Sequence, residues 1–299
     1  MLCTWGVDGS RSRSASCMSA NVSERLLVES RGKDLITVRF DALGHSCEIL
    51  LPAMSRHAAL AIGTVAAMEA WRIERKYERQ WADSVTANIH VHRGSRINVD
   101  DETASLIEFS MRCFEISGGK FDITSGALRR ARNVGGSRQF TDTSAAGVPL
   151  PSVGLDNLQW EPPNLLLPRG MELDLGAVAR DYAVDQVSEL LERRNWAPCL
   201  VKIGCRWRAH RVPSQGPWQI ETDECGTHPI GGRRLTLERG ALAMSGDRDR
   251  RTPEQVGRRF VTVAAGTCQQ AGFLSTVAVL HGAGARQFLR GTGHRHWLG

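Results

Sequence analysis

Residues 172–185 read Glu-Leu-Asp-Leu-Gly-Ala-Val-Ala-Arg-Asp-Tyr-Ala-Val-Asp, and the predicted fold is built outward from this stretch. An apolar strand is predicted over 171–173, and small residues then open a helix predicted over 176–194. Backbone N–H groups at such a helix start form an anion site, which Gly176 leaves open and Arg180 would clamp. Asp174 as a plain helix cap explains the same pattern, so both interpretations stay open.

The flanking sequence predicts a mixture of strands and helices. Strands at 35–40 and 47–51 around Gly44 indicate an opening hairpin, and helices follow from a Ser55 cap to 76 and from Asp100 or Asp101 to 117. Downstream, strands are predicted at 199–203, 218–221, 235–237, 241–245 and 260–264, and a final helix at 269–289. This order predicts an α+β fold.

We expect one domain over 35–299, preceded by a disordered segment over 1–34. Residues 132–168 are rich in Gly, Ser, Pro and Asn and predict long loops with one short strand near 154–160. A sub-boundary within the domain is therefore best placed in this region.

Composition excludes several classes of protein. The chain has 299 residues, of which 41% are hydrophobic and 23% charged, and this excludes disordered, collagen-like and membrane-spanning chains. No apolar run fits a signal peptide, a lipoprotein leader or a membrane helix, so the sequence as written predicts a cytoplasmic protein. The eight cysteines form no Cys-x-x-Cys pair, which argues against a zinc ribbon and indicates a reducing compartment.

The positive charge is carried almost entirely by arginine. The formal net charge is +6, and 34 of the 38 basic residues are Arg. The planar guanidinium binds phosphate in pairs of hydrogen bonds, which favours a phosphorylated or nucleic-acid partner, although biased codon usage gives the same count. The basic residues are dispersed along the chain, so no nucleic-acid partner is expected.

A second informative stretch, 117–126, reads Ser-Gly-Gly-Lys-Phe-Asp-Ile-Thr-Ser-Gly. The glycines end a helix, and an exposed strand over 120–124 is predicted to follow, along which a flat ring would lie. Asp122 and Thr124 would offer it polar contacts. A plain helix C-cap explains the two glycines equally well.

Together the two stretches resemble the FAD:protein FMN transferases, the ApbE family, and the likeness extends in order over most of 40–289. Residues 40–44 resemble the opening Phe-x-Ala-Met-Gly of the family, 75–90 its Tyr/Ser-rich turn ending in Ile-Asn, and 120–124 its Phe-Asp-Ile-Thr. Residues 174–185 are similar to Asp-Leu-Gly-Gly-Ile-Ala-Lys-Gly-Tyr-Ala-x-Asp, 244–247 to Thr-Ser-Gly-Asp, and 271–276 to Ala-Asp-Ala-Leu-Ala-Thr.

The resemblance implies a mixed α+β, T-fold-like protein that binds FAD with Mg²⁺ on its diphosphate. Such enzymes release AMP and attach FMN through a phosphoester to a Thr or Ser of a target protein. Carried over by position, the FAD contacts would be Leu43, Tyr77, Lys120, Phe121, Asp122, Asp174 and Arg180. The Ala177 carbonyl and the Thr276 hydroxyl would help to hold the metal.

Several positions depart from the family pattern. Gly272 replaces the Asp of Ala-Asp-Ala-Leu-Ala-Thr, and Arg206 replaces the acid of Asn-Leu-Gly-Gly-Asp. Restoring the carboxylate with Gly272→Asp is expected to raise metal affinity if the site is otherwise intact. In an active transferase, Asp247, Asp249 or water would hold the ion in its place. The alternative to an active transferase is a catalytically impaired flavin-binding relative that acts as an adaptor or carrier.

Two other groups of residues have the composition of a binding site, one for a metal ion and one for a nucleic acid. His90 and His92, and likewise His294 and His296, have the spacing of metal ligands, but strand alternation or a frayed tail explains them better. Residues 206–211, Arg-Trp-Arg-Ala-His-Arg, would stack on the bases of a single-stranded nucleic acid, a third hypothesis for function. A solvated hairpin that carries arginines is the interpretation that we favour for them.

Overall fold

The computed structural model describes residues 22–125, 153–222, 234–246 and 260–299. Its centre is a sheet in the order β1-β2-β3-β7-β8-β11-β12-β13, with every neighbouring pair antiparallel. The strands are β1 (Leu27–Arg31), β2 (Leu35–Ala42), β3 (His45–Pro52), β7 (Leu200–Ile203), β8 (Arg206–Ala209), β11 (Gly240–Gly246), β12 (Phe260–Ala265) and β13 (His296–Leu298).

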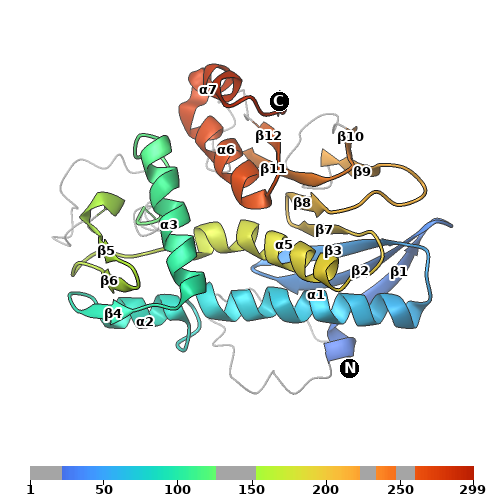
Figure 1. Cartoon of the computed structure of the whole chain (residues 1–299), viewed down its shortest axis with the longest axis horizontal. Coiled ribbons are helices and arrows are strands. Elements are labelled where there is room, and N and C mark those ends of the chain that lie inside the picture. Colours follow the sequence, from blue (N-terminus) through green and yellow to red (C-terminus); the bar gives the residue numbers. More distant parts are fainter. Residues whose placement is uncertain (1–21, 126–152, 223–233, 247–259) are drawn as a thin grey trace, which may run out of the picture.

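Helices cover one face of this sheet (Figure 1). Helix α1 (Arg56–Tyr77) packs on β2, α5 (Gly176–Arg193) on β7 and β8, and α6 (Cys268–His281) on β11 and β12, while α5 contacts both other helices. The hairpin β9 (Trp218–Glu221) and β10 (Arg234–Leu237) covers part of the opposite face. Strand alternation separates the two cores, since Ile49 and Leu51 face the helices and Leu50 faces the hairpin.

Smaller elements lie beyond the N-terminal end of α5 (Figure 1). They are α2 (Val85–Val91), α3 (Asp101–Ile116), the 3₁₀ turn η3 (Leu155–Asn157), and a sheet in the order β4-β6-β5, made of β4 (Arg96–Asn98), β6 (Asn164–Leu166) and β5 (Gln159–Glu161). The chain ends with η5 (Gly282–Gly284), α7 (Ala285–Thr292) and β13.

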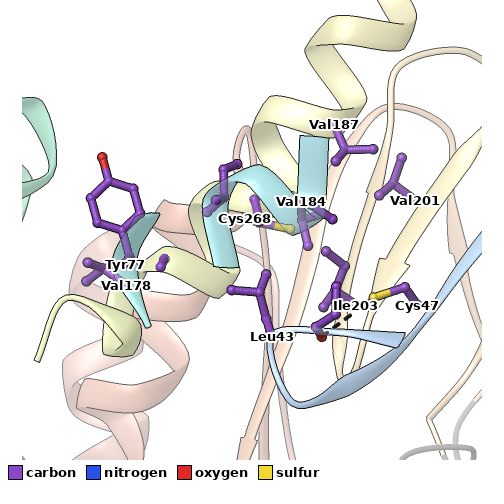
Figure 2. Packing of buried hydrophobic residues seen from close by; sticks show 14 of the residues in the cluster. Leu43, Cys47, Tyr77, Val178, Val184, Val187, Val201, Ile203 and Cys268 are labelled. Atoms are coloured by element: carbon purple, nitrogen blue, oxygen red, sulfur yellow. Dashed lines mark hydrogen bonds between the residues drawn. The ribbon is translucent and has the colours of Figure 1, made fainter. Parts of the chain in front are cut away.

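Local signals explain the elements that the sequence predicted correctly. Ser55 accepts a hydrogen bond from the Ala58 N–H and starts α1, and Asp100 accepts one from the Thr103 N–H and starts α3. The core beneath α5 is built from branched residues of the helix and strands, such as Val184 and Val187 against Val201 and Ile203 (Figure 2). The prediction of an α+β fold is confirmed.

The hairpin between β2 and β3 turns within two residues. Ala42 pairs with His45, and the two residues between them, Leu43 and Gly44, have φ angles of 55° and 70°. Such a turn requires positive φ at both positions, which is unusual for leucine and is imposed here by the hairpin. The constraint fixes the direction of the Leu43 side chain.

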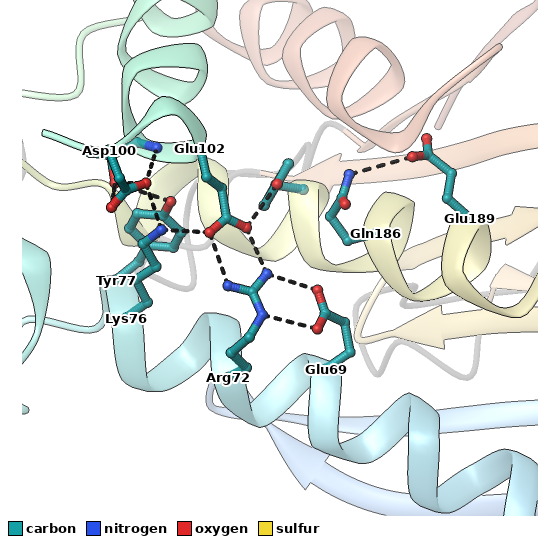
Figure 3. A network of polar contacts seen from close by, with 10 residues as sticks. Glu69, Arg72, Lys76, Tyr77, Asp100, Glu102, Gln186 and Glu189 are labelled. Carbon is teal, nitrogen blue, oxygen red and sulfur yellow. Dashed lines mark hydrogen bonds and ion pairs between the residues drawn. The ribbon is translucent and has the colours of Figure 1, made fainter. Parts of the chain in front are cut away.

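A polar network joins three helices at this end of the molecule (Figure 3). Glu102 of α3 accepts hydrogen bonds from Arg72 and Lys76 of α1 and from the Tyr182 hydroxyl of α5, at 2.5 to 2.9 Å. Burial acts to raise the pKa of Glu102, but these donors lower it to about 2. The network therefore holds α3 against the start of α5 as long as Glu102 is ionised.

Four predictions about secondary structure were wrong. Residues 22–31, placed in the disordered segment, form η2 (Val22–Arg25) and β1, while residues 1–21 lie outside the described part of the chain. Neither 171–173 nor 120–124 is a strand: Met171 makes an isolated bridge, and 120–124 consists of bends and turns. The helix predicted over 269–289 breaks at Gly282, where φ is 56°.

Gly63→Ala tests the packing of α1 on the sheet. A β-carbon at Gly63 would lie 2.3 Å from Val38 Cγ1, so something must shift. We expect overpacking to lower the free energy of unfolding by about 1–3 kcal/mol, more than the gain of about 1 kcal/mol in helix propensity. Urea denaturation measures the difference.

Gly291→Ala in α7 is the matched control, because no atom lies within 4 Å of its β-carbon. Its stability is expected to rise by up to about 1 kcal/mol. An equal gain in Gly63→Ala would contradict the close approach of α1 to β2.

Candidate functional site

A cavity of about 350 Å³ opens where α5 begins, within the range of about 300–1,000 Å³ typical of small-molecule sites. The β2–β3 turn, α3, the first turns of α5, strand β8 and helix α6 all contribute to its wall. The lining residues are Leu43, His45, Glu78, Phe109, Phe121, Asp174, Gly176, Val178, Arg180, Asp181, Arg206, Gln269, Phe273 and Thr276.

The two stretches singled out in the sequence meet at this cavity. The Asp174 N–H donates to the Ile123 carbonyl at 2.8 Å, and the Leu173 N–H donates to His90 Nε2 at 2.9 Å. The first bond aligns the segment before α5 beside the turns that follow α3, and the second ties this segment to α2. Burial is the main reason that the pKa of His90 is lowered, so its ring is a neutral acceptor near pH 7.

The corner at Gly176 is narrow. A β-carbon there would lie 3.3 Å from Asp174 Oδ1 and 3.4 Å from Glu78 Oε1. Leu175, the residue before the helix, makes no side-chain cap. Burial, and then the charge of Asp174, raise the pKa of Glu78. Two carboxyl groups therefore flank the start of α5.

Arg180 and His45 form a second polar wall. Arg180 Nη1 donates to His45 Nε2 at 2.8 Å, and Arg180 Nε lies 3.7 Å from Asp181 Oδ1. His45 immediately follows the constrained β2–β3 turn, so the hairpin positions the histidine that orients the arginine. The cation predicted one helical turn into α5 thus does line the cavity.

The least expected feature is a buried ion pair between Arg206 and Asp181. Arg206 Nε donates to Asp181 Oδ1 at 2.6 Å, and Nη1 donates to the carbonyls of Cys205 and Met244. The side chains are only 4% and 10% exposed. Burial acts to lower the pKa of Arg206, but Asp181 more than offsets it, so the guanidinium stays charged.

This pair overturns the interpretation of 206–211 as a solvated hairpin. Arg206, Trp207 and His210 are buried, and 206–209 form the inner strand β8. Trp207 packs under the β9–β10 hairpin, so it offers no ring for stacking a base. The nucleic-acid hypothesis loses the cluster on which it rested.

Gly272 lies directly against the same carboxylate. A β-carbon at position 272 would lie 1.7 Å from Asp181 Oδ2, so a side chain there requires the Asp181 carboxylate to shift. The gain in metal affinity expected from Gly272→Asp required an otherwise intact site, and it stays a prediction. Sequence reasoning missed Asp181, although the signal was present: the family motif has glycine at that position.

The predicted site residues divide into two groups. Leu43, Phe121, Asp174, Arg180 and Thr276 line the cavity, whereas Tyr77, Lys120 and Asp122 do not.

The residues outside the lining have other places. Tyr77 is fully buried beside α3, with its hydroxyl 3.3 Å from Thr103 Oγ1. Asp122 Oδ1 accepts from the N–H and the hydroxyl of Thr124, each at 2.7 Å, and Lys120 is exposed. Ala177 supplies backbone to the first turn of α5.

The Thr276 hydroxyl, predicted to bind a metal ion, lies in a network of hydrogen bonds. Thr276 Oγ1 lies 3.1 Å from Ser245 Oγ, which also accepts from Arg206 Nη2 at 3.3 Å. Within the described ranges, no group of three His, Cys, Asp or Glu is placed to hold a metal, and Asp247 and Asp249 lie outside them. Of the helices that the structure describes, none has the length and apolar composition needed to cross a bilayer.

Comparisons with known proteins agree on the fold and the family. The ApbE family model matches residues 43–295. The ApbE protein of Thermotoga maritima superposes with a TM-score of 0.71 at 24% identity, covering 88% of this chain and 94% of that one. The flavinyl transferase ApbE of Pseudomonas stutzeri gives 0.71 at 18% identity, covering 90% and 92%.

A curated relative is also similar in sequence. The FAD:protein FMN transferase of Haemophilus influenzae is 28% identical over 179 residues, which are 55% of this chain. The match spans 50% of the relative's length.

Glu78→Gln tests the electrostatics of the corner. Because the folded-state pKa of Glu78 is raised, ionising it disfavours the folded state, and stability falls as pH rises from its ordinary pKa near 4.5 through the raised value. We expect the variant to unfold at higher urea than the wild type at pH 7, and at the same urea concentration at pH 4.

Glu115→Gln, at an exposed position of α3, is the control and should change neither midpoint. A Glu78 variant that is less stable than the wild type at pH 7 would show that the carboxylate is held by a favourable contact instead.

Proposed function

Because this chain belongs to the ApbE family, we propose that it is an FAD:protein FMN transferase. The acceptor is a Thr or Ser hydroxyl of a target protein, and AMP is released. One observation carries the proposal: the cavity at the start of α5 combines apolar walls, two arginines and a helix start. These features suit the flat ring and the charged bridge of a flavin dinucleotide.

The apolar part of the wall would receive the ring system. Leu43, Phe121 and Phe273 line the cavity, and the rings of Phe121 and Phe273 meet edge to face with centroids 5.6 Å apart. Aromatic and branched side chains bury flat ligands well because they lose little conformational freedom. The diphosphate would then lie toward Gly176 and the arginines.

The transfer itself is a displacement at phosphorus. The acceptor oxygen forms a bond to the FMN phosphorus, the bond from that phosphorus to the bridging oxygen breaks, and AMP leaves with that oxygen while the hydroxyl proton is released. Oriented N–H donors and fixed cations favour the charge that develops on the phosphoryl oxygens. Arg180 and the start of α5 are the groups that we assign to this task.

Tyr77 and Asp122 take positioning roles in this proposal. Tyr77 fills the core between α1 and α3, and Asp122 fixes the turn that carries Phe121. Lys120 is given no role. Asp174 remains the proposed polar contact because its carboxylate lies against Gly176 inside the cavity.

Mg²⁺, which the resemblance also implies, does not fit the described residues. The carboxylate that lies against Gly272 is that of Asp181, and it is bound to a buried guanidinium. A divalent cation would have to share its ligands with this positive charge in a region of low dielectric. We therefore derive no step through a metal ion.

The competing proposal is a flavin-binding adaptor without transferase activity. It is favoured by the altered positions 206 and 272, and it predicts the same cavity. Incubation with FAD and a target peptide of the family, with and without Mg²⁺, separates the two. AMP release with a matching gain in peptide mass supports the transferase, FAD binding without turnover supports the adaptor, and no FAD binding contradicts both.

Asp174→Ala is predicted to weaken FAD binding about tenfold, the effect of losing one hydrogen bond from a charged group. Quenching of flavin fluorescence measures the dissociation constant. Asp34→Ala is the control, because Asp34 is exposed at the opposite end of β2, about 30 Å from the turn at Leu43. Unchanged FAD binding by the Asp174 variant would remove this residue from the site.

A further inference from the structure

The Arg206–Asp181 pair lines the cavity, and the function proposed above uses Arg206 only as one of its two arginines. Several hydrogen bonds hold Arg206 in place. Its Nε donates to Asp181, its Nη1 to the carbonyls of Cys205 and Met244, and one N–H of its Nη2 to Ser245 Oγ. Among the described residues, the second N–H of Nη2 has no acceptor. A fixed cation with a spare donor therefore lies in the wall of the cavity.

Three positions that depart from the family pattern meet at this pair. The family pattern has glycine, acid and acid where this chain has Asp181, Arg206 and Gly272. Asp181 Oδ2 occupies the volume that a side chain at 272 would need, 1.7 Å from its β-carbon. The carboxylate therefore enters from α5 instead of α6, and an arginine from β8 is bound to it.

The hydroxyl groups nearby are committed to the same network. Ser245 Oγ lies 2.9 Å from Ser275 Oγ and 3.1 Å from Thr276 Oγ1, and it accepts from Arg206. Ser275 donates in turn to the Gly272 carbonyl at 3.1 Å. The oxygen atoms that a divalent cation would require are thus organised around a guanidinium.

We propose that the Arg206 guanidinium, held by Asp181, replaces a divalent cation as the fixed positive charge that faces the diphosphate of FAD. FAD binding then requires no metal ion. The inference rests on the proposed flavin site and deepens it. Arg180, on the same wall and 3.7 Å from Asp181, supplies a second guanidinium, and two such groups match the paired oxygens of a diphosphate.

The first test uses the wild-type protein, stripped of metal with EDTA. FAD titrations followed by flavin fluorescence are run in EDTA and in excess Mg²⁺. The proposal predicts the same dissociation constant in both. Binding that needs Mg²⁺ overturns this proposal and leaves the flavin site standing, whereas no binding in either condition overturns the proposed function itself.

The second test removes the charge without leaving a carboxylate unpaired. Arg206→Gln combined with Asp181→Asn keeps two polar groups in place and is expected to weaken FAD binding in EDTA about tenfold or more. Arg208→Gln is the matched control, because Arg208 makes the next α5–β8 ion pair, with Asp185 at 2.6 Å, and does not line the cavity. Wild-type affinity in the double variant, with the control also unchanged, overturns the proposal.

The third test restores the family pattern and decides the matter if the double variant does not fold. Asp181→Gly, Arg206→Asp and Gly272→Asp are made together, since a side chain at 272 would otherwise meet the Asp181 carboxylate. The triple variant is predicted to bind FAD only with Mg²⁺ and to gain thermal stability on its addition. FAD binding by the triple variant that is as tight in EDTA as that of the wild type overturns the proposal.

Discussion

The buried contact between Arg206 and Asp181 is the constraint on which the arrangement of this cavity depends. It joins β8 to α5, and through the Met244 carbonyl it reaches β11. Removing one partner of such a pair costs about 3–5 kcal/mol, because the other charge is left buried and unpaired. Gly272 of α6 lies against the same contact, and a β-carbon there would require the Asp181 carboxylate to shift. One ion pair thus sets the separation of three elements that surround the site.

Rigid elements hold the remaining walls. The two-residue turn at Leu43 fixes His45, His45 accepts from Arg180, and the Asp174 N–H secures the turn around Ile123. Each group that would meet a ligand is therefore positioned by a second contact behind it, which is how precise sites are built. The side chains that line the cavity are therefore held in place before a ligand binds.

Local patterns in the sequence predicted much of the fold and failed where long-range pairing decides. The caps at Ser55 and Asp100 and the hairpin at Gly44 carry their signals within a few residues, and those elements were predicted correctly. Residues 120–124 and 171–173 have the composition of strands but form none. The backbone hydrogen bond between the two regions runs from the Asp174 N–H, just after 171–173, to the Ile123 carbonyl. Ordered motifs placed Leu43, Phe121, Asp174, Arg180 and Thr276 at one cavity. Arg206 was misjudged because its charge indicated a surface, and only the fold brings Asp181 beside it.

The most direct measurement of the central claim is a crystal structure of this protein with FAD bound in the presence of EDTA. The account predicts that the diphosphate lies at the start of α5, in contact with Arg180 and Arg206, and that the flavin ring lies against Phe121. A diphosphate that lies away from both arginines, or FAD bound outside this cavity, would contradict it.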